Sequence, residues 1–235
     1  MNFLDKIMAS NVDDYPEDKI IYDPVPIRLF KSNFLEFFTH VTPVTVVVIW
    51  LPVSLIFLYL GITQWPAAIT PLLIPFLVAL GVFIVWTLSE YFIHRFLFHM
   101  ETHSRLGAQV VFLFHGIHHV QPAIKTRLVM PPAASIPMGV LAYFVFSLIF
   151  NLLGIPGLML PLLAGFTLGY IAYDLTHYAT HHSRTKNAIM KFLKRHHMEH
   201  HYKTPKARFG VTSNVWDLVF KTEPPVSGPL PADAR

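Results

Sequence analysis

Apolar residues dominate two long stretches of the chain, residues 41–88 and 133–176, and neither stretch contains a lysine or an arginine. One helical crossing of a bilayer takes about 20 apolar residues, so each stretch is long enough to cross twice. The expected spans are Val41–Leu60, Ala67–Leu88, Ala133–Leu153 and Gly157–Tyr173, joined within each pair by Gly61–Pro66 and Gly154–Pro156. The pattern predicts an all-α integral membrane protein with four transmembrane helices in two hairpins.

Polar residues return before, between and after the hairpins. Residues 1–40 form an N-terminal arm, in which Pro26–His40 mixes phenylalanine and leucine with charges. That mixture favours either a helix lying in the membrane interface or an irregular arm packed on the domain. The arm begins with charged residues rather than an apolar run, so no cleavable signal peptide is expected. Residues 223–235 are rich in proline and are expected to form a flexible tail, and residues 1–235 are expected to form one domain.

The second and fourth spans are expected to continue past the membrane. The second would run on through Glu90 and His94, and the fourth would carry Asp174 out of the bilayer. Gly165 and Gly169 in the fourth span have the spacing of small-xxx-small pairs, which let helices approach closely. Glycine is also simply tolerated in membrane helices, so both explanations remain open.

Composition and charge agree with a membrane protein. The chain is 53% hydrophobic and 14% charged, with a mean hydropathy of +0.47. All 18 lysines and arginines lie outside the two hairpins, and the positive-inside rule then places both termini and the polar segments in the cytoplasm. Because topology explains the basic residues, nucleic acid is not expected as a partner. The chain has no cysteine, which excludes disulfides, iron–sulfur clusters and thiolate zinc sites.

Histidines gather in four short arrays, which this topology puts on one side of the membrane as a histidine-rich cytoplasmic cap. Residues three or four apart share a helical face, and imidazole is the commonest metal ligand near neutral pH. Ten nitrogen ligands are too many for one ion and suit two, so a dinuclear site is expected. The candidate ligands are His94, His99, His115, His118, His119, His177, His181, His197, His200 and His201.

Three further histidines, His103, His182 and His196, lie beside the arrays, and their roles are left open. The five-residue step from His94 to His99 does not fit one face of an ideal helix, so a distortion or a helix end is expected there. Ligands that are all imidazole suit zinc, copper, iron or nickel.

Charged residues near the arrays suggest supporting roles. Asp174 and Glu90 precede His177 and His94 by three and four residues. A carboxylate there could accept the N–H of a ligand histidine and fix its orientation, although either could be an ordinary charge at the membrane boundary. Arg127 stands alone beside an apolar run and is a candidate for binding the polar head of a substrate; the alternative is anchoring to lipid phosphates.

The motifs in order resemble the fatty acid hydroxylase/sterol desaturase superfamily of membrane di-iron enzymes, and more narrowly the fatty acid 2-hydroxylases. The resemblance covers about residues 90–222. It rests on the histidine arrays together with Arg127-Leu-Val-Met-Pro-Pro132, Phe209-Gly-Val-Thr-Ser213 and Trp216-Asp217. The last blocks are more specific than a His-x-x-His-His array alone.

The resemblance implies an O2-dependent monooxygenase with two iron ions, acting on a fatty acyl or sphingolipid substrate drawn from membrane lipid. Tyr173 and Asp174 would support the site, and zinc would compete for it in purified protein. Residues 1–40 are too short for the cytochrome-b5-like haem domain of eukaryotic relatives, so a separate cytochrome-b5-like or ferredoxin-type donor would supply electrons. The resemblance assigns one ion to His94, His99, His115, His119 and His200, and the other to His118, His177, His181, His197 and His201.

Other functions remain as alternatives. The superfamily also hydroxylates or desaturates sterols, carotenoids and alkyl lipids, although the Arg127–Pro132 block argues against these. A membrane zinc carrier or store would favour polar groups within the spans, but residues 41–88 and 133–172 contain no Asp, Glu, Lys, Arg or His. A zinc hydrolase would need three ligands and an open position, which the excess of histidines disfavours.

Overall fold

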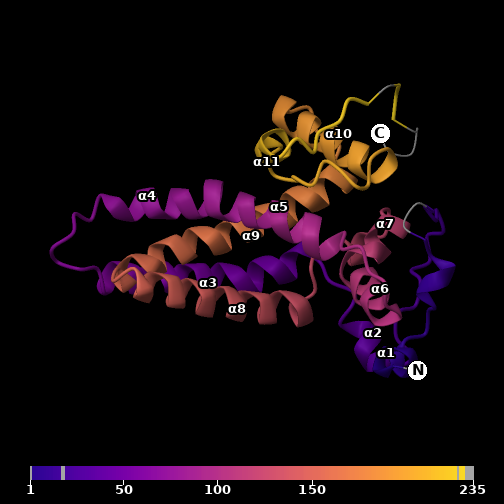
Figure 1. Cartoon of the computed structure of the whole chain (residues 1–235), viewed down its shortest axis with the longest axis horizontal. Coiled ribbons are helices and arrows are strands. Elements are labelled where there is room, and N and C mark those ends of the chain that lie inside the picture. The colour runs from indigo at the N-terminus through magenta and orange to yellow at the C-terminus, as the bar shows by residue number, and fades with distance from the viewer. Residues whose placement is uncertain (1, 17–18, 227, 231–235) are drawn as a thin grey trace.

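The computed structural model describes residues 2–16, 19–226 and 228–230 of the chain. Across these residues the fold is helical, with a single isolated β-bridge between Met8 and Phe30 and no strand. Four helices are long and apolar enough to cross a membrane, which confirms the prediction of four spans in two hairpins. The protein is a multi-pass membrane protein. Its remaining short helices gather at one end of the bundle (Figure 1).

The first hairpin consists of α3, Pro43–Thr63, and a second span over Leu73–Phe98. That second span is built from α4 (Leu73–Leu80), a π-helical turn (Gly81–Trp86), α5 (Thr87–Ile93) and another π-helical turn (His94–Phe98). It begins six residues after the predicted Ala67, because Pro66 and Pro71 hold the connection in turns.

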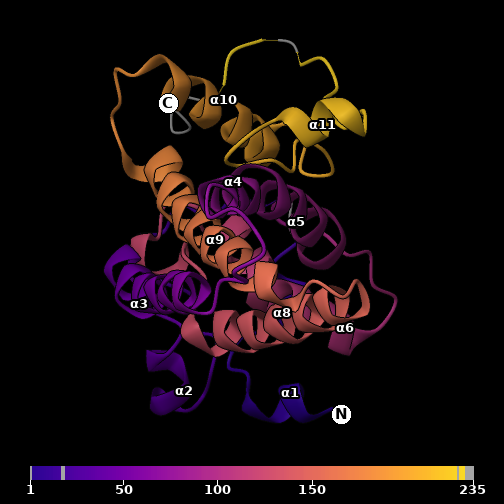
Figure 2. The same cartoon turned by 90° about the vertical axis from the view of Figure 1, so that its left-hand side faces the viewer.

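The second hairpin consists of α8, Pro132–Leu152, and α9, Met159–His182. Helix α9 occupies the centre of the bundle, between α3, α4 and α8 (Figure 2). Its most apolar window is 67% buried, compared with 6–22% for the other three spans. As predicted, α9 continues as one helix through Asp174 to the histidines at its C-terminal end.

Close packing of α9 against the second span depends on glycine. A Cβ atom added to Gly165 would lie 2.1 Å from the carbonyl oxygen of Val78, and one added to Gly169 would lie 2.5 Å from the Trp86 side chain. Of the two explanations for these glycines, the structure therefore favours close helix packing.

Changing Gly165 to alanine should consequently destabilise the bundle. The added methyl group meets backbone, which cannot move aside as a flexible side chain can, so we expect a loss of about 1–3 kcal/mol or more. Thermal unfolding in detergent, followed by circular dichroism, measures this effect. Gly154→Ala would be an unsuitable control because its φ is +71°, whereas Val140→Ala changes methyl groups at an exposed position of α8. An unchanged melting temperature for Gly165→Ala would contradict the close approach.

The cap consists of α6 (Arg105–Val111), a π-helical turn (Phe112–Gly116), α7 (Ile117–Val120), α10 (Ala188–Tyr202) and α11 (Val215–Val219). Single 3₁₀ turns cover Val12–Asp14, Lys125–Arg127 and Pro156–Leu158.

The N-terminal arm contains α1 (Phe3–Ile7) and α2 (Asn33–Phe37). Only α2 is helical within Pro26–His40, so this segment is mainly an irregular arm packed on the domain, with exposed phenylalanines on its short helix. Of the predicted flexible tail, 223–235, positions 227 and 231–235 lie outside the described residues.

Candidate metal centre

Ten histidines from distant parts of the chain meet where the spans enter the cap. They form two groups, and within each group one ligand atom per residue lies within 4.8 Å of all the others. The first histidine group is His94, His99, His115, His119 and His200; the second histidine group is His118, His177, His181, His197 and His201. This is the same division that the resemblance implied.

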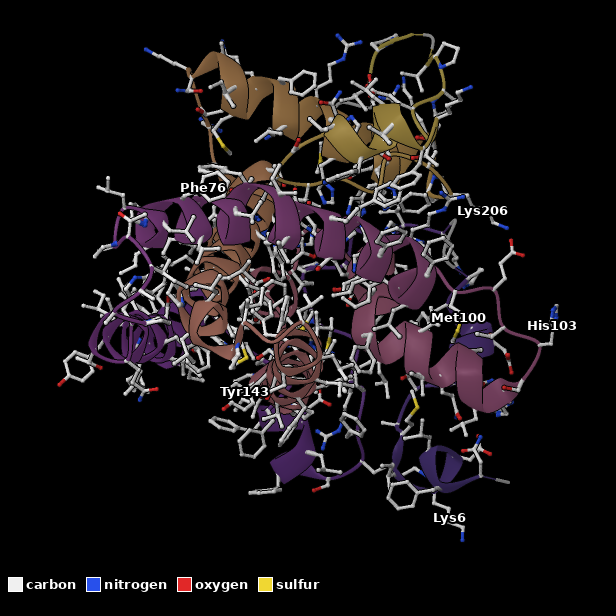
Figure 3. The ribbon with its side chains drawn as sticks, turned by 60° about the vertical axis from the view of Figure 1, so that its left-hand side comes forward. Lys6, Phe76, Met100, His103, Tyr143 and Lys206 are labelled. Carbon is white, nitrogen blue, oxygen red and sulfur yellow. The ribbon has the colours of Figure 1, made fainter. Side chains whose placement is uncertain are left out.

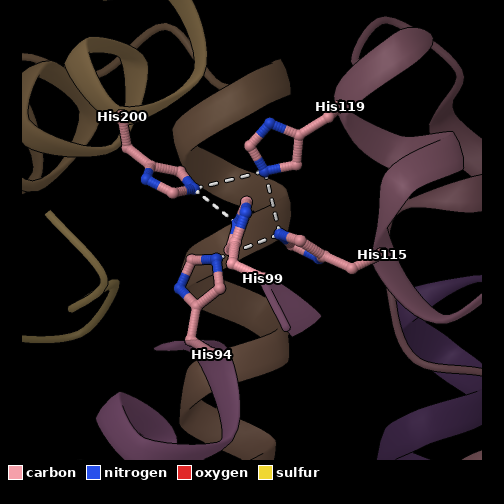
Figure 4. A group of neighbouring side chains, drawn as sticks. All are labelled: His94, His99, His115, His119 and His200. Atoms are coloured by element: carbon pink, nitrogen blue, oxygen red, sulfur yellow. Dashed lines mark hydrogen bonds between the residues drawn. The ribbon is translucent and has the colours of Figure 1, made fainter. Parts of the chain in front are cut away.

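The rings of the first histidine group face one another through their Nε2 atoms (Figure 4). The Nε2 atom of His115 lies 3.0 Å from that of His94 and 2.9 Å from that of His119. His200 closes the group, with its Nε2 atom 3.1 Å from His99 and 3.2 Å from His119.

A π-helical turn brings His94 and His99 into the same group. The backbone N–H of His99 donates to the carbonyl of His94 at 3.1 Å, five residues back. An extra residue in this turn rotates the end of the helix, so two residues five apart can face one point. The distortion predicted between these residues is therefore present.

The second histidine group is built in the same way at the end of α9. Nε2 atoms lie 3.0 Å apart in the pairs His177–His118, His197–His181 and His201–His197. The two groups touch, because the rings of His119 and His201 stack with centroids 4.1 Å apart.

The donor sets fit metal ions. Nitrogens that each lie 2.0–2.1 Å from one ion are roughly 3 Å apart, which is the spacing found in both groups. Burial and the neighbouring His200 lower the pKa of His99 to about 2, and burial lowers that of His200 to about 4. These rings are therefore neutral at pH 7 and carry the lone pair that binds a cation. Each group could hold one metal ion.

Backbone carbonyls orient two rings of the first histidine group. His200 Nδ1 donates to the carbonyl of Ala207 at 2.6 Å, and His94 Nδ1 donates to that of Phe209. We call residues 207–212, which supply these carbonyls, the brace loop. Hydrogen bonds of this kind fix the tautomer and direction of a ligand histidine.

Two buried carboxylates hold the brace loop in place. Glu90 accepts the backbone N–H groups of Val211 at 2.6 Å and Thr212 at 2.9 Å, and also the Thr212 hydroxyl. Asp217 accepts those of Phe209 and Gly210, both at 2.8 Å. Glu90 thus supports His94 through the loop rather than by direct contact. Sequence reasoning gave Asp217 no role; its only signal was its place in the Trp216-Asp217 motif.

Tyr173 and Asp174 lie next to the second histidine group. The Tyr173 ring centroid is 5.6 Å from that of His177. Asp174 Oδ1 accepts the backbone N–H of Met130 at 3.4 Å, and among the described residues no hydrogen bond joins Asp174 to His177. The expected direct carboxylate–histidine contact is therefore not seen.

Arg127 is 7% exposed and binds Glu36 of the arm, which is incompatible with anchoring to lipid phosphates at the surface. The three further histidines beside the arrays lie outside both groups. His196 is buried with its Nε2 atom 3.2 Å from Asp217, and His182 is half-buried beside the second histidine group. His103 is exposed at the periphery of the cap (Figure 3).

Two cavities lie near the metal centre, and one of them is lined by histidines. A cavity of about 630 Å³ lies between the spans and is lined by apolar and aromatic side chains, including Trp50, Phe166 and Tyr170. A second, of about 320 Å³, is lined by His115, His118 and His177 together with Arg127 and Asp174. Phe98, Met130 and Tyr173 line both cavities, so the two cavities are neighbours.

Known proteins share both the sequence and the fold. Residues 77–222 match the family model for fatty acid hydroxylases. The chain is 38% identical to the dihydroceramide fatty acyl 2-hydroxylase FAH1 of Arabidopsis thaliana, over 86% of this chain and 82% of that protein. It is 35% identical to the human fatty acid 2-hydroxylase, over 88% of this chain and 60% of the human protein.

A solved structure is also similar, that of full-length scs7p, in which only the hydroxylase domain is visible. It matches with a TM-score of 0.79 and 36% identity, over 98% of this chain and 86% of the other. With the family model covering more than half of the residues, and with a relative 38% identical over most of both chains, the chain belongs to the fatty acid hydroxylase family.

Proposed function

We propose that this protein is a membrane monooxygenase that hydroxylates a fatty acyl chain at its 2-position, giving a 2-hydroxy fatty acid or a 2-hydroxyacyl lipid. The observation that carries the proposal is the pair of five-histidine groups, three of whose members line a cavity that neighbours an apolar cavity between membrane spans. Relatives named as fatty acid 2-hydroxylases and as dihydroceramide fatty acyl 2-hydroxylases support the position of hydroxylation.

The ten histidines would hold two iron ions, one in each group. Such a pair, when bound, supplies the redox chemistry that activates O2. The protein's own part is to keep the rings neutral and oriented: the brace loop fixes His94 and His200, while Tyr173 packs beside His177 of the second histidine group and Asp174 holds the backbone of Met130.

A lipid substrate would use both cavities. Its tail fits the apolar space between the spans, which a lipid can enter from the bilayer without crossing water. Its carbonyl end would lie in the second cavity, with Arg127 as the candidate to bind it. The carbon next to the carbonyl would then sit near the side chains that both cavities share, beside the histidines. Binding of the tail in the apolar cavity would thus hold the 2-position, rather than another carbon, beside the metal centre.

Electrons are proposed to come from a separate cytochrome-b5-like or ferredoxin-type donor. We place both termini and the metal centre in the cytoplasm, because all 18 lysines and arginines lie outside the hairpins. Zinc, which binds nitrogen sites more strongly than ferrous iron, would occupy the same histidines without supporting turnover.

Comparative lipidomics of cells with and without the protein tests the proposal. We expect acyl lipids that gain one oxygen atom, with fragmentation placing the hydroxyl on the carbon next to the carbonyl. Purified protein reconstituted with iron and a reductant should form the same product from O2, and zinc-only protein should form none. A hydroxyl elsewhere, a new double bond, or turnover with zinc alone would contradict the proposal.

A further inference from the structure

Helix α11 has an apolar face that no part of the described structure covers. Val215, Leu218 and Val219 are 52%, 60% and 57% exposed, and the next residue, Phe220, is 40% exposed. The other face of the helix is buried, with Asp217 completely enclosed. A short helix with so much apolar surface turned outward requires a partner outside the fold.

Hydrogen bonds on the buried side of α11 fix the direction in which this apolar face points. Asp217 accepts two backbone N–H groups of the brace loop and the hydroxyl of Thr222 at 2.7 Å. Trp216 Nε1 donates to the hydroxyl of Thr87, in the second span, at 2.9 Å. These bonds prevent α11 from rotating its apolar side chains into the protein.

The bond to Thr87 also sets the depth of α11. Thr87 is 14 residues beyond Leu73, where the second span begins, so it lies roughly 21 Å along the helix at 1.5 Å per residue. The hydrocarbon core of a bilayer is about 30 Å thick. Thr87 therefore lies inside the thickness that this span crosses. Figures 1 and 2 both show α11 beside α5 rather than beyond its end.

Aromatic contacts join this face to the outer surface of the second span. The ring centroids of Phe220 and Phe92 are 5.6 Å apart, and those of Phe92 and Phe96 are 5.8 Å apart. Phe92 and Phe96 are themselves exposed. Two basic residues border the patch: the guanidinium of Arg95 lies 5.0 Å from the centre of the Phe96 ring, and Lys221 is exposed. Long basic side chains can reach headgroups while their stems cover apolar surface.

We propose that α11 is embedded in the membrane leaflet on the metal-centre side, with Val215, Leu218 and Val219 among lipid chains and Lys221 at the headgroups. The occupant is lipid because the patch is continuous with the surface that a membrane span already exposes, at a depth that a water-soluble partner cannot reach. The cap is therefore seated in the membrane through α11 in addition to the four spans. This seat is independent of the reaction proposed above.

The chain contains no cysteine, so one introduced cysteine carries one label. Leu218→Cys and Val219→Cys, each modified with a nitroxide, are placed in phosphatidylcholine nanodiscs, and collision rates with O2 and with a water-soluble nickel chelate are measured. Phe83→Cys, at an exposed position within the second span, is the lipid reference, and His103→Cys in the cap is the water reference. Both test positions are exposed, so labelling should not disturb folding.

We expect the nitroxides at 218 and 219 to behave like that at 83, with high O2 and low nickel accessibility. Accessibility like that at position 103 would overturn the proposal. So would low accessibility to both reagents, since this would mean that protein, such as a second copy of the chain, covers the face. Two independent positions keep the test valid if one variant expresses poorly.

Discussion

Replacing His119 with alanine is expected to abolish turnover and to release the metal of the first histidine group. His119 is 1% exposed, with its Nε2 atom 2.9 Å from His115 and 3.2 Å from His200. Its ring also stacks on His201 of the second histidine group. One substitution therefore removes a ligand from the first histidine group and also removes the closest ring contact between the two histidine groups.

Loss of a residue that is hydrogen-bonded to a metal ligand lowers metal affinity or activity roughly 10–100-fold. Loss of the ligand itself should therefore lower them by more than about 100-fold. Product formation by mass spectrometry and metal content by plasma mass spectrometry measure the two effects. We expect the metal content to fall from two ions per chain towards one.

His103→Ala is the matched control. His103 follows His99 by four residues, a ligand-like spacing in the sequence, but it is exposed and outside both groups. This variant should keep both metals and full activity. If His119→Ala retained two metals, or if His103→Ala lost one, the assignment of ligands would be wrong.

The features that could be predicted from the sequence are those that depend on composition along the chain. Four spans follow from two uncharged stretches of sufficient length. An even number of crossings separates the histidine arrays, so the arrays must lie on one side of the bilayer. Ten imidazoles gathered on one side indicate a metal site, because imidazole is the commonest metal ligand near neutral pH. The misfit between His94 and His99 likewise indicated the distortion that the π-helical turn provides.

Other features depend on the backbone and leave little trace in the sequence. The carbonyls of Ala207 and Phe209 orient two histidines, yet a carbonyl is present at every residue. Glu90 was expected to touch His94 because the two lie four apart on a helix; instead its carboxylate binds a loop that is about 120 residues away in sequence. Asp174 is a second case in which sequence spacing did not show which group the carboxylate binds, because it accepts the backbone N–H of Met130.

Replacing Glu90 with leucine tests this indirect support. The carboxylate of Glu90 is buried and accepts three hydrogen bonds from Val211 and Thr212. Leucine has a similar size but no acceptor oxygen, so the backbone N–H groups of Val211 and Thr212 both lose their acceptor. A buried donor left without an acceptor costs about 1–3 kcal/mol. The brace loop should loosen, and the Phe209 carbonyl should leave His94.

We expect this variant to bind metal at the first histidine group about 10–100-fold more weakly, while the second histidine group, which makes no described hydrogen bond to the brace loop, keeps its metal. Titration with a competing chelator, read by metal content per chain, separates the two sites. Glu101→Leu is the matched control, because Glu101 is an exposed carboxylate paired with Lys206 at the surface. Equal weakening of both sites would indicate a general loss of folding, and no weakening would show that His94 needs no brace. If Glu90 supports His94 through the brace loop, the metal affinity of the first histidine group alone should fall.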